Sequence, residues 1–153
     1  MDAVDRQLIA ALRANARASY AELGRLVGLS GPSVTDRVNR LEQAGVITGY
    51  RALVAPQAIG LGVSALVGLL LPEVADHDGV ADRLRDILEV EDCWFIAADD
   101  SFLLKVRVRD VDALAGVVGR LAAVPGVARV RTTVVLATYW EGRVPDPPED
   151  EPA

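Results

Sequence analysis

Two adjoining stretches decide the fold of this chain: residues 19–29 read SYAELGRLVGL, and residues 30–47 read SGPSVTDRVNRLEQAGVI. Ser19 followed by Glu22 forms a capping box, in which the serine hydroxyl accepts from an N–H of the first turn while the glutamate reaches back to the cap. Ser30 is a second N-cap. A short helix, a tight turn and a second helix therefore follow one another, which predicts a helix-turn-helix.

The second helix of this motif has one apolar and one polar side. Val34, Val38 and Leu41 recur at helical spacing and are expected to face a core. The second helix of such a motif enters the major groove, where hydroxyl, amide and guanidinium groups contact phosphates and base edges. The candidate DNA contacts are therefore the polar residues of this helix and its cap, with Arg37 on the flank: Ser30, Ser33, Asp36, Arg37, Asn39 and Arg40.

A further helix is expected before the motif and a short strand after it. The stretch VDRQLIAALRANA (4–16) has Asp2 as its expected cap and an apolar stripe formed by Val4, Leu8, Ala11 and Leu12. Gly45 ends the second helix of the motif. VITGYRALV (46–54) is rich in β-forming residues and predicts a short strand or wing. A winged helix-turn-helix domain is therefore expected over residues 1–54.

Charge is distributed unevenly along the chain. Residues 1–54 hold seven arginines and five acidic residues, whereas residues 55–153 hold nine basic and seventeen acidic ones. A chain of net charge −6 with a mildly basic end fits local contact with DNA and does not fit a general nucleic-acid coater. A plain three-helix bundle with a solvated polar face is the alternative, and the mixture of serine, asparagine and arginine favours DNA binding over it.

The second half of the chain alternates strand and helix patterns after a hinge at 55–62. Strands are expected within 61–71, 90–98, 101–108 and 126–140, and helices within 79–89 and 111–124. The order β-α-β-β-α-β predicts an α+β, ferredoxin-like domain over 63–140, in which two helices cover one face of a four-stranded antiparallel sheet. The expected helix stripes are Val80, Leu84, Ile87 and Leu88, then Val111, Leu114, Ala115, Val118 and Leu121. The acidic, proline-rich residues 141–153 are expected to be a disordered tail.

The first strand of this domain is apolar on both faces. Val63, Ala65, Val67 and Leu69 share one face, and Leu66 and Leu70 lie on the other. Two helices cover only one face of the sheet, so the other face needs a different cover. We expect a homodimer through that face, since exposed apolar patches of this size are rare in monomers. An unusually hydrophobic run within a monomer is the alternative.

Several classes of protein are disfavoured by the residues that the chain lacks. No signal-peptide pattern and no apolar run of membrane-spanning length occur, so we expect a cytoplasmic protein. Cys93, expected to be a buried strand residue, has no second cysteine to pair with, and His77 is the one histidine. No nucleophile, phosphate-binding or metal-ligand motif is present, so no catalytic residue, cofactor or metal is expected.

The chain resembles the leucine-responsive regulator/AsnC (Lrp/AsnC) family of transcription factors over residues 2–140. The matching stretches are DAVDRQLIAAL, AELGRLVGLS, VTDRVNRLEQAGVITGYRALVAP, CWFIAADDSFLLKV and LAAVPGVARVRTTVVL. The resemblance implies a winged helix-turn-helix joined to a ferredoxin-like effector domain, dimers that assemble into octamers, and an amino acid or related small molecule bound between dimers. Sirohaem decarboxylases resemble the same family, and a ligand sensor without DNA binding is a third reading. The single His77 disfavours the enzyme, and Ser33, Arg37 and Arg40 disfavour the sensor.

The turn that lines the small-molecule site in this family departs from the usual pattern. The family has a glycine, two intervening residues, an aspartate and an aromatic residue. Here the glycine position is Ala98 and the aspartate position is Ser101, with Asp99 and Asp100 between them and Phe102 after them. Ala98 hinders a close backbone approach, and Ser101 removes a carboxylate that would hold an amino group. The resemblance assigns these four turn residues to the effector, with altered ligand chemistry; Asp99 or Asp100 either replaces the carboxylate by a register shift or is merely solvated.

Overall fold

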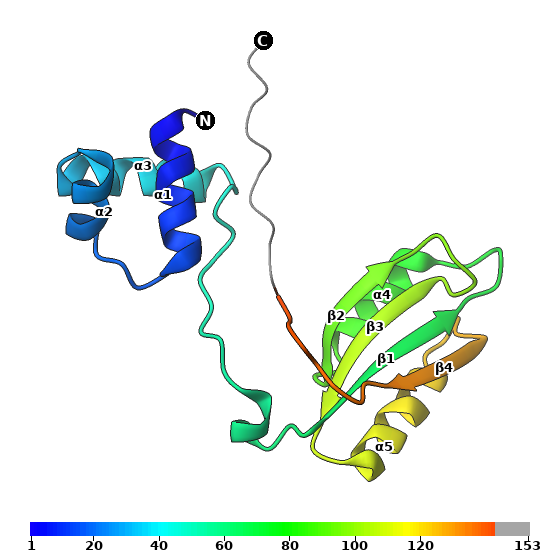
Figure 1. Cartoon of the computed structure of the whole chain (residues 1–153). Coiled ribbons are helices and arrows are strands. Elements are labelled where there is room, and N and C mark those ends of the chain that lie inside the picture. Colours follow the sequence, from blue (N-terminus) through cyan, green and yellow to red (C-terminus); the bar gives the residue numbers. More distant parts are fainter. Residues whose placement is uncertain (143–153) are drawn as a thin grey trace. The chain divides into compact units, whose positions relative to one another are not determined.

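A computed structural model describes residues 1–142 as two compact units, Met1–Leu53 and Val54–Gly142. The first consists of helices and the second is built around a sheet, and each has its own hydrophobic core. They are called the helical unit and the sheet unit below (Figure 1). None of the helices in residues 1–142 has the length and apolarity needed to cross a membrane.

The helical unit holds three helices whose starts are set by side-chain caps. These are α1 (Ala3–Ala14), α2 (Tyr20–Val27) and α3 (Gly31–Gln43). The caps predicted at Asp2, Ser19 and Ser30 are confirmed, and α2 ends at a left-handed glycine. The core beneath the helices consists of Leu8, Leu12, Leu23, Val34 and Val38. The predicted apolar side of α3 is therefore correct.

Residues 46–54 form no strand, contrary to the expectation of a wing. This segment leaves α3 as irregular chain, with Ile47 packed against the helical core and the Tyr50 hydroxyl donating to Glu42 at 2.8 Å. A strand needs a neighbour that satisfies its N–H and C=O groups. The sheet found in residues 1–142 contains four strands, and all of them belong to the second unit. The β-forming residues of 46–54 therefore have no neighbouring strand with which to pair.

The sheet unit has the predicted β-α-β-β-α-β order. The strands are β1 (Val63–Leu70), β2 (Val90–Phe95), β3 (Phe102–Val108) and β4 (Arg129–Val134), arranged antiparallel in the order β2-β3-β1-β4. Helices α4 (His77–Arg85) and α5 (Val111–Ala122) lie on one face of this sheet (Figure 1). A short 3-10 turn at Pro56–Ile59 precedes β1 within the expected hinge.

Burial along the central strand β1 follows its two faces. Ala65, Val67 and Leu69 are fully buried beneath the helices, whereas Leu66 on the other face is 37% exposed. We call this second side the open face. In the pairing register, Gly68 of the open face lies opposite Leu103 of β3 and Arg131 of β4.

Four expectations about individual residues in the sheet unit are wrong. Leu88 is 92% exposed, because α4 ends at Arg85 before the stripe reaches it. The stripe expected on α5 is wrong at two positions: Val111 is 64% exposed and Ala115 is exposed, whereas Val117, which was not assigned to the stripe, is buried. Cys93 is exposed, because β2 is an edge strand with a neighbour on one side only.

The fourth wrong expectation concerns the start of the tail. Glu141 is the first residue of the expected disordered segment, yet its carboxylate pairs with Lys105 and lies 2.7 Å from Arg107 Nη2 on β3. These two cations hold the pKa of Glu141 below its ordinary value. Residues 143–153 of the expected tail lie outside the described residues.

Candidate DNA-binding helix and effector turn

The exposed side of α3 brings together most of the predicted DNA contacts. Val34, Val38 and Leu41 are buried, so the residues between them at helical spacing face outwards. Ser33, Asp36, Asn39 and Arg40 are all exposed. At the start of the helix, the Ser33 N–H donates to Ser30 Oγ at 3.4 Å and the two hydroxyls lie 2.9 Å apart. This face presents hydroxyl, amide, carboxylate and guanidinium groups in one row.

Arg37 differs from the other candidates because α1 already binds its guanidinium. Its Nη1 lies 2.7 Å from Asp2 Oδ2 and 2.7 Å from Asp5 Oδ1. Asp2 and Asp5 are also the two members of the capping box of α1. The hydrogen bond from Arg37 is the main cause that lowers the pKa of Asp5. The pKa of Asp2 is lowered first by the Asp5 N–H and then by Arg37. Arg37 therefore joins the second helix of the motif to the start of the first helix.

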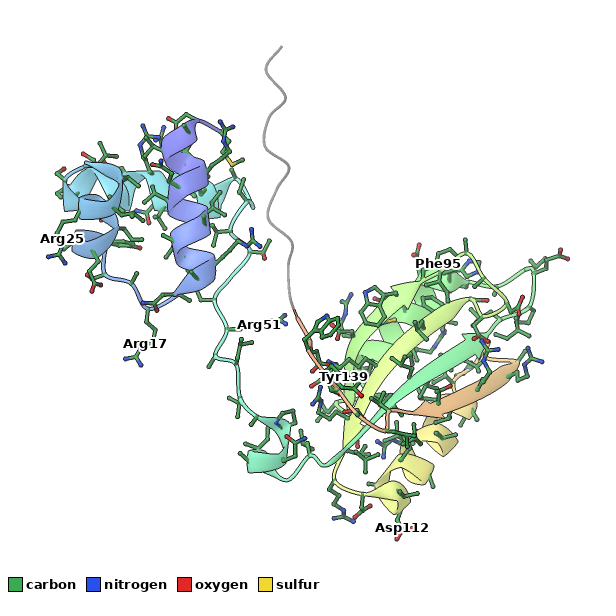
Figure 2. The ribbon with its side chains drawn as sticks, in the orientation of Figure 1. Arg17, Arg25, Arg51, Phe95, Asp112 and Tyr139 are labelled. Atoms are coloured by element: carbon green, nitrogen blue, oxygen red, sulfur yellow. The ribbon has the colours of Figure 1, made fainter. Side chains whose placement is uncertain are left out.

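Further arginines extend from the helical unit outside the motif's second helix. Arg17 before α2 and Arg25 in its last turn are exposed, and Figure 2 shows both side chains directed away from the helices. Arg51, after α3, is exposed as well. The sequence pattern predicted DNA contacts on α3 and its cap alone. The positive charge of residues 1–54 was the signal that could have added these side chains.

The predicted effector turn between β2 and β3 is fastened to the end of β1 through Ser101. The Ser101 N–H donates to the Leu69 carbonyl at 2.8 Å, and its hydroxyl oxygen accepts from the Leu71 N–H at 3.1 Å. The Ser101 carbonyl accepts from the Ile96 N–H at 3.0 Å. Ala98 and Asp99 are exposed at the tip of the turn.

Asp100 is buried, so the alternative of a solvated turn residue is wrong for it. The residue is 3% exposed, and its carboxylate pairs with the Arg131 guanidinium on β4. The carboxylate lies over Gly68, where a Cβ atom would come within 2.6 Å of Asp100 Cγ. The absence of a side chain at Gly68 makes room for this acid on the open face. Sequence reasoning gave no role to Gly68 or Arg131, because neither lies near the turn in the chain.

The open face carries apolar residues in its centre and a charge cluster at one end. A depression of about 310 Å³ is bounded by Leu66, Ser64, Lys105 and the segment from Val135 to Glu141. Glu91 lies 2.6 Å from Lys105 Nζ and 2.9 Å from Arg107 Nε, and Glu141 completes the charge cluster. Tyr139 and Trp140 of the bordering segment are 88% and 77% exposed, and Figure 2 shows Tyr139 beside the sheet.

His77, the one histidine of the chain, packs against an aromatic residue. His77 lies at the start of α4 with its ring packed edge-on against Phe95 at 4.8 Å between centroids. Within residues 1–142, no group of three histidine, cysteine, aspartate or glutamate side chains is arranged to hold a metal ion.

Comparison with known proteins agrees with the two-unit organisation. The model of the AsnC-type helix-turn-helix domain matches residues 1–42, and that of the Lrp/AsnC ligand-binding domain matches residues 64–145. The HTH-type transcriptional regulator LrpA of Mycobacterium tuberculosis is 38% identical over 94% of this chain and 95% of its own length. Regulatory protein AsnC of Escherichia coli is 32% identical over 89% of this chain and 90% of its own length.

Solved structures of Lrp/AsnC regulators have the same fold as this chain. The feast or famine regulatory protein of M. tuberculosis, complexed with L-methionine, is similar with a TM-score of 0.89 and 38% identity, covering 95% of this chain and 99% of that chain. Both family models, the relatives and the fold agree with the resemblance seen in the sequence. The chain belongs to the Lrp/AsnC family of transcriptional regulators, with a helix-turn-helix DNA-binding domain and a ligand-binding domain.

Proposed function

We propose that this regulator recognises a specific double-stranded DNA site through α3, assembles as a homodimer through the open face, and responds to an amino acid or a related small molecule at the turn 98–101. The observation that carries the first part is the row of exposed polar side chains on α3, opposite a fully buried apolar side. A helix with these two sides, preceded by a short capped helix, has the form that enters a major groove.

The candidate contacts divide by chemistry. Arg40 supplies a guanidinium for a phosphate or a guanine, and Ser33, Asp36 and Asn39 face base edges. Ser30 caps α3 by accepting from the Ser33 N–H, and it lies at the exposed N-terminal end of the helix, where a phosphate can bind. Arg37 serves the interface less directly: its hydrogen bonds to Asp2 and Asp5 hold α3 against α1.

Arg40→Ala tests this assignment. Loss of one charged phosphate contact should weaken binding to all sequences and reduce the slope of log affinity against log salt by roughly one. The measurement is a titration at several salt concentrations, with a DNA site enriched from a random library by the wild-type protein and with a shuffled site. Arg85→Ala is the matched control, because the Arg85 side chain is 82% exposed on α4 in the sheet unit. Equal affinity and slope for wild type and Arg40→Ala would contradict the assignment.

The homodimer is argued from the composition of the open face. The helices of this unit leave this face uncovered, and Leu66 lies on it beside the exposed aromatic pair Tyr139 and Trp140. A second copy presents the same apolar surface, so the two faces can cover each other around a two-fold axis. Dimers of this kind place two α3 helices for two half-sites. We further propose that four such dimers assemble into an octamer.

Leu66→Asp tests the interface. A charge at this position would be buried without a partner in the dimer, which should shift the protein to monomers at micromolar concentration. Leu88→Asp is the control, since Leu88 is 92% exposed in the turn between α4 and β2. Sedimentation velocity distinguishes the two variants. A wild-type monomer, or a dimer unchanged by Leu66→Asp, would refute the interface.

The effector part of the proposal is supported by the fold match to a relative whose solved structure contains L-methionine. In this chain, the turn 98–101 is bonded to the end of β1 through Ser101 and to β4 through Asp100. A rigid turn with exposed backbone loses little entropy on binding a small ligand. We assign the effector site to this turn.

A further inference from the structure

The groups around the turn 98–101 favour one class of effector over another. Resting on the proposed effector site, we propose that this chain binds a carboxylic acid without an ammonium group, such as an α-keto or α-hydroxy acid, in preference to the corresponding amino acid.

Ser101 offers a donor where a carboxylate would offer an acceptor. Its hydroxyl oxygen already accepts from the Leu71 N–H at 3.1 Å. The hydroxyl hydrogen and one lone pair remain, so Ser101 can donate to a ligand carboxylate, and it accepts only as a neutral group. An aspartate at this position would bring a negative charge for an ammonium group. Ser101 therefore removes the ammonium partner and adds a partner for an anion.

Asp100 does not replace that missing charge. Its carboxylate is buried on the open face over Gly68 and pairs with Arg131. A ligand ammonium would have to compete with the guanidinium and draw the acid out of its buried position. Such a buried, paired carboxylate is a weak site for a second cation, because its charge is already compensated.

The turn offers several hydrogen-bond donors to a carboxylate. No N–H group of Ala98, Asp99 or Asp100 has a hydrogen-bond partner within residues 1–142. Arg131 and Arg129 lie on the open face of β4, which the proposed partner subunit covers, so they are not counted among these donors. The free N–H groups suit a carboxylate, because a hydrogen bond to a charged acceptor is stronger than a hydrogen bond between two neutral groups.

Asp99 is the remaining acid of the turn, and it is exposed at the tip. An ion pair in full contact with water contributes little, so Asp99 compensates an ammonium group poorly. An amino acid would keep its carboxylate contacts here but lose a strong partner for its ammonium. An α-keto acid of the same shape has no such group to satisfy.

The experiment compares matched pairs by calorimetry on the full-length protein: leucine, methionine, phenylalanine and alanine, each against its own α-keto acid. At least one keto acid should bind about tenfold or more tightly than its amino acid, the ratio expected for one charged hydrogen bond left unmade. Ser101→Asp should reverse the preference within that pair. Asp112→Asn, the control, changes an exposed acid on α5 outside the turn and should leave the preference unchanged.

Other results would overturn the proposal. Tighter binding of the amino acid in every pair, no binding by any member, or a preference that Ser101→Asp leaves unchanged would each do so. DNA binding without added ligand is measured in parallel on the same preparations. If the wild type binds its DNA site and the keto-acid preference fails, the effector class alone is wrong; if it binds no double-stranded DNA, the proposed function fails.

Discussion

Replacing Gly68 with alanine should destabilise the sheet unit, because the new methyl group would collide with a buried carboxylate. The added Cβ would lie 2.6 Å from Asp100 Cγ and nearer still to one carboxylate oxygen, whereas real Cβ atoms approach neighbours no closer than 3.0 Å. Asp100 would have to leave its position, where it is 3% exposed and paired with Arg131. The backbone on either side can stay, since every atom within that distance belongs to the Asp100 side chain.

Two opposing contributions set the size of the effect. Losing a hydrogen bond between charged groups costs about 1.5–3 kcal/mol. The lower part of that range applies, because the Arg131 side chain is 60% exposed and water can replace its partner. Alanine gains about 0.5–1 kcal/mol over glycine within a strand. Gly68→Ala should lower the free energy of unfolding by about 1 kcal/mol. The coupling free energy between positions 68 and 100 should be about 1.5–2 kcal/mol.

A double-mutant cycle measures that coupling. In an Asp100→Ala background the colliding carboxylate is absent, so Gly68→Ala should be neutral or stabilising. Urea unfolding followed by tryptophan fluorescence reports on the sheet unit, since both tryptophans, Trp94 and Trp140, lie in it. Protein concentration is held constant, because a dimer's stability depends on it.

Gly116→Ala on α5 is the matched control for this cycle. A Cβ there meets nothing within 4 Å, so the substitution should stabilise the unit by up to about 1 kcal/mol. The reasoning would be refuted if Gly68→Ala cost the same with and without the Asp100 carboxylate, or if it stabilised the wild type.

Three further predictions concern residues outside this pair. Arg37→Gln should lower the melting temperature of the helical unit and weaken DNA binding, because Arg37 binds Asp2 and Asp5. The slope of log affinity against log salt should stay close to the wild-type value. A slope reduced as much as in Arg40→Ala would make Arg37 a phosphate contact. The Arg37 hydrogen bond lowers the pKa of Asp5 from 3.8, so this pair adds stability above that pH and loses it as pH falls through the lowered value. The difference between the urea midpoints of wild type and Asp5→Asn should therefore be constant from about pH 7 to about pH 4 and shrink below that pH, and a difference that stays constant on further acidification would exclude the linkage. Cys93 is the one cysteine and is exposed, so it should react completely with a thiol reagent in the folded protein. The reaction should be slower than that of free cysteine, because partial burial raises the pKa of the Cys93 thiol. A thiol that reacts only after unfolding would contradict the exposure.

Several features of this fold could be read from the chain because they depend on neighbours in sequence. The caps at Asp2, Ser19 and Ser30 bond to N–H groups three residues onwards, so their partners are fixed by spacing. The apolar stripe of α3 likewise follows from the helical period. The order of helices and strands in the second half was predicted for the same reason, and it led to the ferredoxin-like arrangement.

The candidate site could be predicted only in part. The exposed row on α3 follows from periodicity, so Ser33, Asp36, Asn39 and Arg40 were chosen correctly as residues that share a face. The roles of other side chains depend on contacts between distant residues. Arg37 has its partners 32 and 35 positions earlier in the chain, and no local pattern indicates that two acids on α1 bind it.

The sequence by itself determined which segments become helices and strands, because capping and periodicity act over three to four residues. Only the tertiary structure decided what those elements contact. It left residues 46–54 unpaired, since β-formers make a strand only beside another strand. It also brought Gly68, Asp100 and Arg131 together, three residues spread over the sheet unit, because antiparallel pairing of β1 with β3 and β4 sets the register on which that contact depends.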